Sequence, residues 1–376
     1  MSFFSRRDFL KTSVTLLGSV AFLQPLAEAV EIKRRKLEKG VAKAGTLSPV
    51  DAGKNALRFT VIGDWGWSGY NYAKTATPED AKGWDERGRG ELSVSAAMGV
   101  FAAQYAPQLA FSVGDNFYPN GVKTVDDERF RTTFEEPFGA AALQIPWYVA
   151  LGNHDIRRNW RAQIEYTQKS KRWNMPAKHY SFSKTAPDGT VVDFFVLDTC
   201  AFHRKLHVGA AIEEADRDAA AQLVWLEREL GASKADWKIL VGHHPVWTGG
   251  VRRDIHEQDL DKLLPPLMKK HGVALYFCGH EHDSQHIERD GIHNILMGNG
   301  GDMRPTGETE GTRYAESRLG FGFVTVDKAA ARIHFVDTKG DVRHAAVIAR
   351  VAASAPSVAP AAPVATPAGV PVPVGA

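Results

Sequence analysis

The stretch "LAFSVGDNFYPNG" (residues 109–121) decides the fold, because an apolar run ends in it at Gly114 and chemically reactive side chains follow at once. A short, continuous apolar run bounded by turn residues is typical of a strand that is buried within a sheet. Ordinary turn chemistry accounts for Gly114, Asp115 and Asn116, but not for Tyr118. The stretch therefore predicts a buried strand whose end is either a plain turn or part of a metal site.

The same pattern recurs along the chain. Apolar, β-branched or aromatic runs stop at a glycine or a polar residue in "LRFTVIGDWG" (57–66), "LAFSVGDNFY" (109–118), "PWYVALGNHD" (146–155), "DFFVLDTC" (193–200), "WKILVGHHPVW" (237–247), "VALYFCGHEH" (273–282) and "NILMGNGG" (294–301). Helical stretches separate several of them, and one, residues 219–231, is expected to end at Gly231. Two late runs, residues 321–327 and 332–338, have no helix between them and predict an antiparallel pair. Strands that alternate with helices, together with this antiparallel pair, predict the α/β fold class (α+β type). In such folds ligands bind at the carboxyl ends of the strands.

Length and composition indicate one large folded unit. The chain has 376 residues, of which 44% are hydrophobic and 24% charged, and its formal net charge is +2. This is ample for a full core, and the balanced charge gives no indication of binding to nucleic acid. Residues 57–350 are interpreted as one domain, and residues 30–56 as a solvated linker. Residues 351–376 consist mainly of Ala, Pro and Val and are predicted to be a disordered tail.

The N-terminus has the features of an export signal. Arg6 and Arg7 precede an apolar run at residues 14–23, and "AEA" (residues 27–29) offers small residues to a signal peptidase. The paired arginines predict that residues 1–29 are a twin-arginine signal peptide. The twin-arginine export machinery is therefore the expected binding partner of this segment. About ten contiguous apolar residues are fewer than the roughly 20 that cross a bilayer, so no stable membrane span is expected. The protein is expected in the periplasm or outside the cell.

Cys200 and Cys278 are the two cysteines of the chain. Two are too few for a disulfide framework, even in an exported protein. Each ends an apolar run, so both are expected to be small buried hydrophobic side chains rather than a disulfide or metal ligands.

Side chains with metal-binding donors follow five of the predicted strands. They are Asp64, Asp115, Tyr118, Asn153, His243, His280 and His282. Any one of them alone is explained by a turn or a structural histidine, but their joint occurrence favours a metal site. Carboxylate and imidazole together suit first-row transition metals, whereas Mg²⁺ and Ca²⁺ prefer oxygen alone. The number of these donors exceeds the number of ligands that a tetrahedral zinc accepts. Two ions that share a bridging carboxylate therefore fit the donor set better.

Tyr118 discriminates among metals. Its phenol has an ordinary pKa of about 10, so it binds as phenolate only to a strongly Lewis-acidic ion such as Fe(III). Without the other six residues, packing of the ring beside Phe117 would be a sufficient explanation. Together with them, Tyr118 indicates a ferric ion in one of the two positions.

With these residues in place, the sequence resembles the metallophosphoesterase (calcineurin-like) superfamily and, within it, the purple acid phosphatases. All five blocks match in order, over roughly residues 57–340, and the resemblance to the small tartrate-resistant acid phosphatases extends to "SKRWNMP" (170–176) and "GHHPVW" (242–247). Other metallophosphoesterases share the acid, Asn and His blocks but lack the tyrosine. The resemblance implies two packed mixed β-sheets flanked by helices, with residues 57–350 as the catalytic domain.

The resemblance also implies a role for each residue. Fe(III) would be bound by Asp64, Asp115, Tyr118 and His282, and a divalent ion (Fe, Zn or Mn) by Asp115, Asn153, His243 and His280, so that Asp115 bridges the ions. His243 is taken as the ligand because relatives often carry Tyr at the position of His244. His154 matches the histidine that contacts phosphate and assists the leaving group. Animal enzymes carry a Glu-His pair where this chain has Val251 and Arg252, so Arg252 is a candidate for holding a phosphate oxygen, or else part of a solvated basic turn.

The predicted function is hydrolysis of small phosphomonoesters by an exported acid phosphatase. Fe(III) would lower the pKa of a bound water, so that hydroxide is available below neutral pH to attack phosphorus. A dinuclear phosphodiesterase acting on nucleotides or phospholipids would use the same ligands and is the first alternative. A non-catalytic surface protein on the same scaffold is the second, and it is disfavoured because no ligand is missing. The sequence leaves the natural substrate, the divalent metal and the oligomeric state open.

Overall fold

The computed structural model of the chain describes residues 35–36, 38–39, 47–53, 55–67, 78–207, 209–251 and 260–350, without the side chains of residues 78–89, 204 and 210. The predicted signal peptide (residues 1–29), the predicted tail (residues 351–376) and Arg252 lie outside the described residues. Among the helices of the described ranges, none is both long and apolar enough to cross a membrane.

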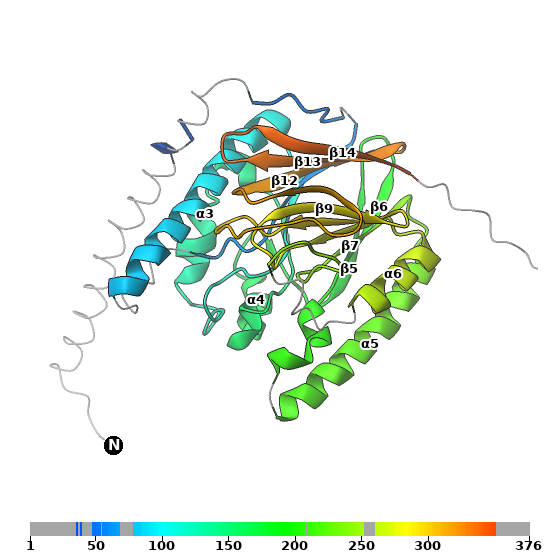
Figure 1. Ribbon diagram of the computed structural model, residues 1–376, viewed down its shortest axis with the longest axis horizontal. Helices are drawn as coiled ribbons and strands as arrows, with labels where there is room; N and C mark the ends of the chain where they lie inside the picture. Colours follow the sequence, from blue (N-terminus) through cyan, green and yellow to red (C-terminus); the bar gives the residue numbers. More distant parts are fainter. Residues whose placement is uncertain are drawn as a thin grey trace, which may run out of the picture.

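Two mixed sheets of seven strands each form the centre of the fold (Figure 1). The first sheet has the strand order β14-β13-β12-β1-β2-β3-β4 and the second β11-β9-β10-β8-β7-β6-β5. The first is made of β1 (Leu57–Ile62), β2 (Leu109–Ser112), β3 (Trp147–Val149), β4 (Trp173–Asn174), β12 (Gly320–Val326), β13 (Ala330–Asp337) and β14 (Val342–Ala349). The second is made of β5 (Tyr180–Thr185), β6 (Val191–Val196), β7 (Trp237–Val241), β8 (Leu275–Cys278), β9 (Ser284–Arg289), β10 (Ile292–Met297) and β11 (Thr312–Glu316). The expected fold is confirmed, and the late antiparallel pair is β12 with β13.

Helices flank the sheets (Figure 1). They are α3 (Pro78–Tyr105), α4 (Trp160–Tyr166), α5 (Ala210–Ala232) and α6 (Leu260–His271), with short helical turns η1 (Phe130–Glu135), η2 (Ala141–Leu143), η3 (Asp155–Arg157), η4 (Thr199–Phe202) and η5 (Arg204–Leu206). The expectation that Gly231 ends α5 is wrong. The helix continues to Ala232 because the amide of Ser233, its C-cap residue, still donates to the carbonyl of Glu229.

Aromatic side chains fill the space between the sheets. Phe59 of β1 packs edge-to-face on Phe111 of β2, and on Phe194 of β6 and Phe277 of β8, with ring centroids 5.5, 5.5 and 5.9 Å apart. Phe59 and Phe111 belong to the first sheet, whereas Phe194 and Phe277 belong to the second. These contacts therefore join the sheets. A second apolar cluster lies between the second sheet and helices α5 and α6. Burial of this aromatic layer is the main driving force that holds the sheets together.

Two further expectations concern buried side chains. Cys200 and Cys278 are both free and buried, which confirms their interpretation as small hydrophobic residues.

Within residues 30–56, Leu47 is 6% exposed and belongs to the main core, and the amide of Ser48 donates to the carbonyl of Gly340 at 3.3 Å. This part of the segment therefore packs against the domain.

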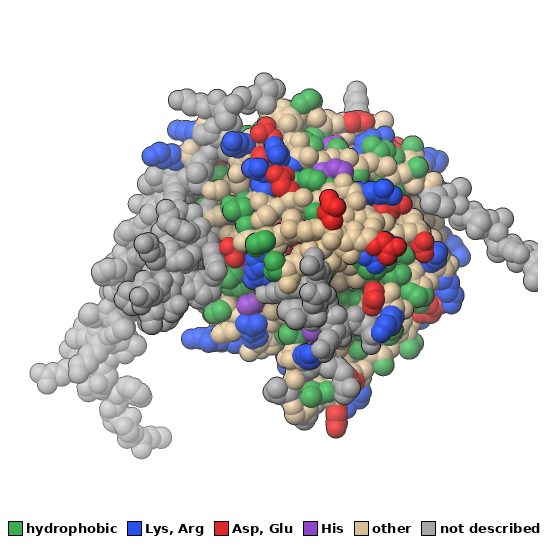
Figure 2. All heavy atoms as spheres, viewed as in Figure 1, with side chains coloured by type: hydrophobic (Ala, Val, Ile, Leu, Met, Phe, Trp, Pro, Cys, Tyr) green, Lys and Arg blue, Asp and Glu red, His purple; other side chains and the backbone are tan. Residues whose placement is uncertain are grey.

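The surface carries charges of both signs. Figure 2 shows basic and acidic side chains interspersed across one face of the molecule. This agrees with the small net charge of the chain.

Parallel pairing brings the strand ends together. In the first sheet β1 is parallel to β2 and β2 to β3, and in the second sheet β6, β7 and β8 are parallel neighbours. The carboxyl ends of parallel neighbours lie at the same edge of a sheet, which is where ligands bind in such folds.

A cluster of three histidines lies at a second contact between the two sheets, away from the aromatic layer. His286 of β9 contacts His344 of β14 (Nδ1 to Nε2, 3.1 Å) and His293 of β10 (Nε2 to Nδ1, 2.9 Å). Tyr314 of β11 stacks on His344 with ring centroids 4.7 Å apart. Burial, together with the neighbouring His293, His344 and Arg313, lowers the pKa of His286 to about 3. His286 is therefore a neutral hydrogen-bonding link between the two sheets.

We expect His286 to make the fold less stable in acid. In the unfolded chain its imidazole binds a proton at about pH 6.5, whereas in the folded chain it does so only near about 3. Between these values the unfolded state binds more protons, so the free energy of unfolding falls as the pH is lowered, by up to about 1.4 kcal/mol per pH unit. His286→Gln, which keeps hydrogen-bonding groups but does not titrate, should reduce this slope in urea unfolding between about pH 7 and pH 4. An unchanged slope would contradict the assignment.

Candidate metal centre

The structure gathers all seven sequence-predicted ligands into one buried cluster. They are Asp64, Asp115, Tyr118, Asn153, His243, His280 and His282, and none is more than 6% exposed. The turns that follow β1, β2, β3, β7 and β8 supply them. Side chains that are far apart in sequence therefore meet because their strands end at one place.

The backbone of these turns is specialised. Asp64, Asp115 and His280 each follow a glycine and have left-handed φ values of 57°, 54° and 73°. Residues other than glycine seldom adopt this conformation, which is held in place by the surrounding structure and is often found at functional sites. A Cβ atom on Gly152 would lie 2.2 Å from the Asp115 amide nitrogen, and one on Gly279 would lie 2.4 Å from Asp64 Oδ2. Only glycine lets these turns approach so closely.

A first group of donors surrounds the hydroxyl of Tyr118. Its oxygen lies 2.8 Å from Asp115 Oδ2, 3.0 Å from Asp64 Oδ1 and 3.1 Å from His282 Nε2. Trp67 stacks on the ring of Tyr118, with centroids 3.8 Å apart and planes at 15°. Burial and the charges of Asp115 and Asp64 raise the pKa of Tyr118. A phenolate at this position therefore needs a cation among the same donors.

A second group surrounds the side-chain oxygen of Asn153. Its Oδ1 lies 2.8 Å from His280 Nδ1 and 3.2 Å from His243 Nε2, and these two nitrogens are 3.2 Å apart. His243, His244 and His280 can each bring one nitrogen within 4.8 Å of the others. The Nδ1 atom of His244, however, is engaged with Thr199 Oγ1 at 2.9 Å.

Asp115 lies between the two groups and directs one carboxylate oxygen to each. Oδ2 faces Tyr118, and Oδ1 lies 3.6 Å from His243 Nε2. Oδ1 also accepts the backbone N–H of His154 at 2.8 Å. Burial alone would raise the pKa of Asp115, but His243, His154 and these hydrogen bonds lower it to about 2. The residue is therefore a charged carboxylate shared by both groups.

The donor chemistry of the histidines fits metal ions. His243 Nδ1 lies 2.9 Å from the carbonyl oxygen of Val113, which can only accept, so Nδ1 carries the proton and Nε2 presents a lone pair. His282 Nδ1 faces Asp302 Oδ2 at 3.2 Å in the same way, so in the neutral ring its Nε2 also presents a lone pair. The lone pair of His243 Nε2 therefore faces the side-chain oxygen of Asn153 at 3.2 Å, and that of His282 Nε2 faces Asp64 Oδ1 at 3.4 Å. A metal ion between such a nitrogen and oxygen accepts a lone pair from each, so both contacts fit metal binding.

Comparison with known proteins identifies the family of the chain. The family model of the calcineurin-like phosphoesterases matches residues 57–284. Tartrate-resistant acid phosphatase type 5 of Oryctolagus cuniculus is 33% identical over 301 residues, which cover 76% of this chain and 88% of the relative. Purple acid phosphatase 7 of Arabidopsis thaliana is 31% identical over 313 residues, which cover 79% of this chain and 88% of the relative. The chain belongs to the purple acid phosphatases, within the calcineurin-like phosphoesterase family.

Family membership makes the chain a metallophosphoesterase of the acid phosphatase type. It supports phosphomonoester hydrolysis and implies a dinuclear metal centre that contains iron, at the level of the family. The His and Asp groups of the cluster are able to bind metal.

Solved structures share the fold of this purple acid phosphatase. GAP50, the anchor in the inner membrane complex of Plasmodium, superposes with a TM-score of 0.63 at 23% identity, covering 80% of this chain and 90% of that one. Purple acid phosphatase PPD1 from yellow lupin seeds superposes with a TM-score of 0.53 at 16% identity, covering 81% of this chain and 55% of that one. At these identities the likeness supports the fold alone.

His154 lies beside the cluster and remains partly accessible, with 14% of its side chain exposed. Its Nδ1 is 2.6 Å from the carbonyl oxygen of Pro119, so the proton lies on Nδ1 when the ring is neutral. Its Nε2 lies 3.9 Å from Asp115 Oδ2, and its ring centroid is 4.3 Å from that of Tyr118. Burial lowers the pKa of His154, and the charge of Asp115 partly opposes this. Arg252, the other predicted substrate-binding residue, is outside the described residues.

The sequence interpretation misses the role of Asp155. Its buried carboxylate accepts the backbone N–H groups of Gly152, Asn116 and Phe117 and the side-chain amides of Asn116 and Gln163, at 2.8–3.2 Å. Burial raises the pKa of Asp155 to about 7, although these donors oppose the shift. Asp155 thus clamps the turn after β2 to the turn after β3. The sequence contains one signal of this role, because Asp155 is the acidic residue that ends the "GNHD" block.

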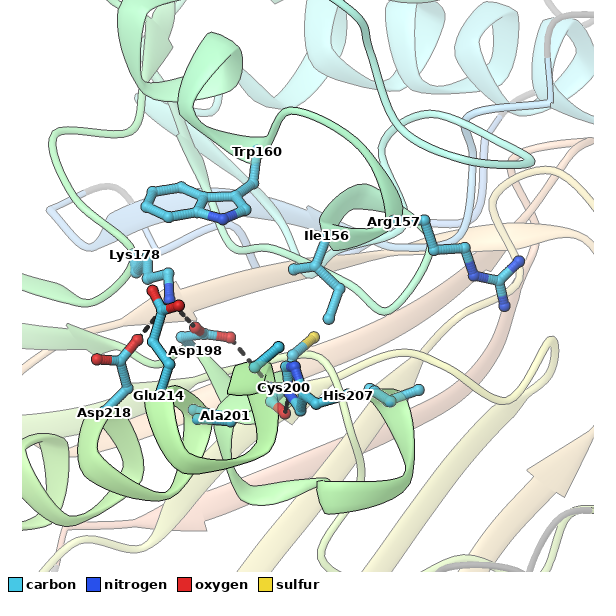
Figure 3. Close-up of a pocket in the computed structure, with 13 residues that line it drawn as sticks. Ile156, Arg157, Trp160, Lys178, Asp198, Cys200, Ala201, His207, Glu214 and Asp218 are labelled. Carbon is cyan, nitrogen blue, oxygen red and sulfur yellow. Dashed lines mark hydrogen bonds and ion pairs between the residues drawn. The ribbon is translucent and has the colours of Figure 1, made fainter. Parts of the chain in front are cut away.

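A cavity of about 380 Å³ lies beside η3 and η4 (Figure 3). Lys178 Nζ is 2.6 Å from Asp218 Oδ2 and 3.8 Å from Asp198 Oδ2, and it lies 4.6 Å from the centroid of the Trp160 ring. Lys178 of the lining is therefore paired with two acidic side chains of the same cavity. Its described lining does not include any of the seven candidate ligands. This cavity is distinct from the metal centre.

Proposed function

We propose that this purple acid phosphatase is an exported dinuclear-metal enzyme that hydrolyses phosphomonoesters. The observation that carries the proposal is the position of Asp115, whose carboxylate oxygens face two separate donor groups. One carboxylate shared by two groups is the donor arrangement of two-metal hydrolases. The intact set of lone-pair donors argues against a purely non-catalytic role.

The two groups have different chemistry, and we assign a different ion to each. Fe(III) would be held by Asp64, Asp115, Tyr118 and His282, and a divalent ion (Fe, Zn or Mn) by Asp115, Asn153, His243 and His280. The phenol distinguishes the first group, because phenolate is a ligand for a strongly Lewis-acidic ion. When bound, the pair of ions supplies Lewis acidity and makes water a competent nucleophile at acidic pH.

The chain itself supplies the proton for the leaving group. His154 has its Nδ1 fixed on the carbonyl of Pro119, so a second proton, in the charged form of the ring, would lie on Nε2, 3.9 Å from Asp115 Oδ2. From Nε2 the imidazolium can protonate or stabilise the departing alkoxide. The backbone N–H of His154 also holds Asp115, so the proton donor and the shared carboxylate keep a fixed relation.

Tyr118→Phe tests the metal assignment. Iron-loaded wild-type protein should show a visible phenolate-to-iron absorption band, and the variant should lose it because its ring has no ligand oxygen. The matched control is Tyr166→Phe, which alters a phenol that stacks on Phe130 and contacts Glu135. Persistence of the band in Tyr118→Phe, or wild-type protein that contains no iron by metal analysis, would overturn the assignment.

His154→Asn tests the proton donor. With an alkyl phosphate, whose leaving group needs a proton, kcat should fall by about 10²–10⁴-fold. With nitrophenyl phosphate the loss should be smaller, because nitrophenolate departs without protonation. His179→Asn, which alters a histidine that packs on Trp225, serves as the control. Equal losses with both substrates would indicate a positioning role and exclude proton donation.

Replacing Arg6 and Arg7 together by Lys tests export. The doubly substituted precursor should stay in the cytoplasm of a bacterial host, because the twin-arginine route requires the paired arginines. Wild-type protein should appear in the periplasm or medium without residues 1–29. The same change at Arg34 and Arg35 is the control, since these arginines follow the proposed cleavage site. Equal export of both variants would refute the twin-arginine assignment.

A further inference from the structure

Arg304 belongs to the loop that follows β10 and contacts the metal centre. Its backbone N–H donates to the carbonyl of His282 at 2.8 Å. In the same loop, Asp302 Oδ2 accepts from Nδ1 of the His282 ring at 3.2 Å. The loop is therefore fixed to a candidate ligand through both its backbone and its side chain. Arg304 has a defined place beside the first donor group.

The guanidinium of Arg304 is placed as an anion-binding group. Its NH1 nitrogen is buried and has no hydrogen-bond partner within the described part of the chain. Its positive charge also acts on Tyr118 and His282, lowering the pKa of each against larger opposing effects. The guanidinium is thus close enough to the first donor group to interact with it electrostatically.

An arginine with a structural role, Arg172, has different surroundings in this fold. Arg172 donates to the carboxylate of Glu135 and to the carbonyls of Phe134, Glu135, Phe138 and Leu143. A buried charged donor that lacks such partners is destabilising unless an anion binds to it. Arg304 therefore retains hydrogen-bonding capacity for a ligand, whereas that of Arg172 is used within the fold.

We infer that Arg304 binds a terminal oxygen of the substrate's phosphoryl group and favours phosphomonoesters over phosphodiesters. The inference rests on the proposed function and deepens it. A monoester carries three terminal oxygens and, above its second pKa of about 6, a charge near −2, whereas a diester carries two such oxygens and a charge of −1. A guanidinium beside the phosphoryl group stabilises the extra oxygen and the extra charge.

Three variants test Arg304. They are Arg304→Gln, which removes the charge, Arg304→Lys, which keeps it without the guanidinium fork, and the control Arg313→Gln, which removes a surface arginine paired with Glu288 at 3.0 Å. Each is assayed at about pH 7, where the monoester is largely a dianion, with nitrophenyl phosphate and bis(nitrophenyl) phosphate. Inorganic phosphate binding is measured in parallel by calorimetry.

In Arg304→Gln, kcat/KM for the monoester should fall by about 10- to 100-fold, mainly through KM, and phosphate should bind more weakly by a similar factor. For the diester the change should stay within about 3-fold. Arg304→Lys should recover part of the loss, and Arg313→Gln should behave as wild type.

Equal losses for both esters, or an unchanged KM with a lowered Tm, would make Arg304 structural and overturn the inference. If wild-type protein hydrolysed neither ester, the proposed function would be wrong. Phosphate calorimetry would then still decide the role of Arg304, because weaker binding in Arg304→Gln than in Arg313→Gln supports it and equal binding refutes it.

Discussion

The structure depends on the contact between strand-end turns around the carboxylate of Asp115. Two sheets each present parallel strands that finish at the same edge, and a glycine before the polar residues lets neighbouring turns touch. Three residues of the cluster adopt left-handed backbone, a conformation that costs roughly 1–3 kcal/mol at each such position. The apolar layer between the sheets offsets this cost, because its burial fixes the strands from which the turns emerge.

Contacts beyond the donor groups stabilise this arrangement. Asp155 fastens the turn of Asp115 to the turn of Asn153 with donors from both, so that the central carboxylate moves with its neighbours. Asp302 fixes the ring of His282 and selects its tautomer, as carboxylates commonly do behind metal-bound histidines. The candidate ligands are thus oriented by partners that lie outside the donor groups.

Much of the fold and the cluster can be predicted from the sequence because the signals are local. An apolar run, a glycine and a donor side chain are adjacent in each block, and the order of blocks follows the order of strands. Asp302 and Arg304 have no such signal, since their positions depend on a loop that returns to His282 after β10. The end of α5 is likewise decided by a hydrogen bond to Glu229, and the burial of Leu47 by its distant partner Gly340, rather than by local composition.

The contacts of the Tyr118 side chain have a consequence for the binding of the proposed ions. The centroid of its ring lies 3.8 Å from that of Trp67 and 4.3 Å from that of His154, and its hydroxyl donates to two carboxylates. A side chain with these contacts has little rotational freedom left to lose on binding a ligand. The proposed ions would therefore bind with little rearrangement of this side chain, and discrimination among them would depend on donor hardness and charge.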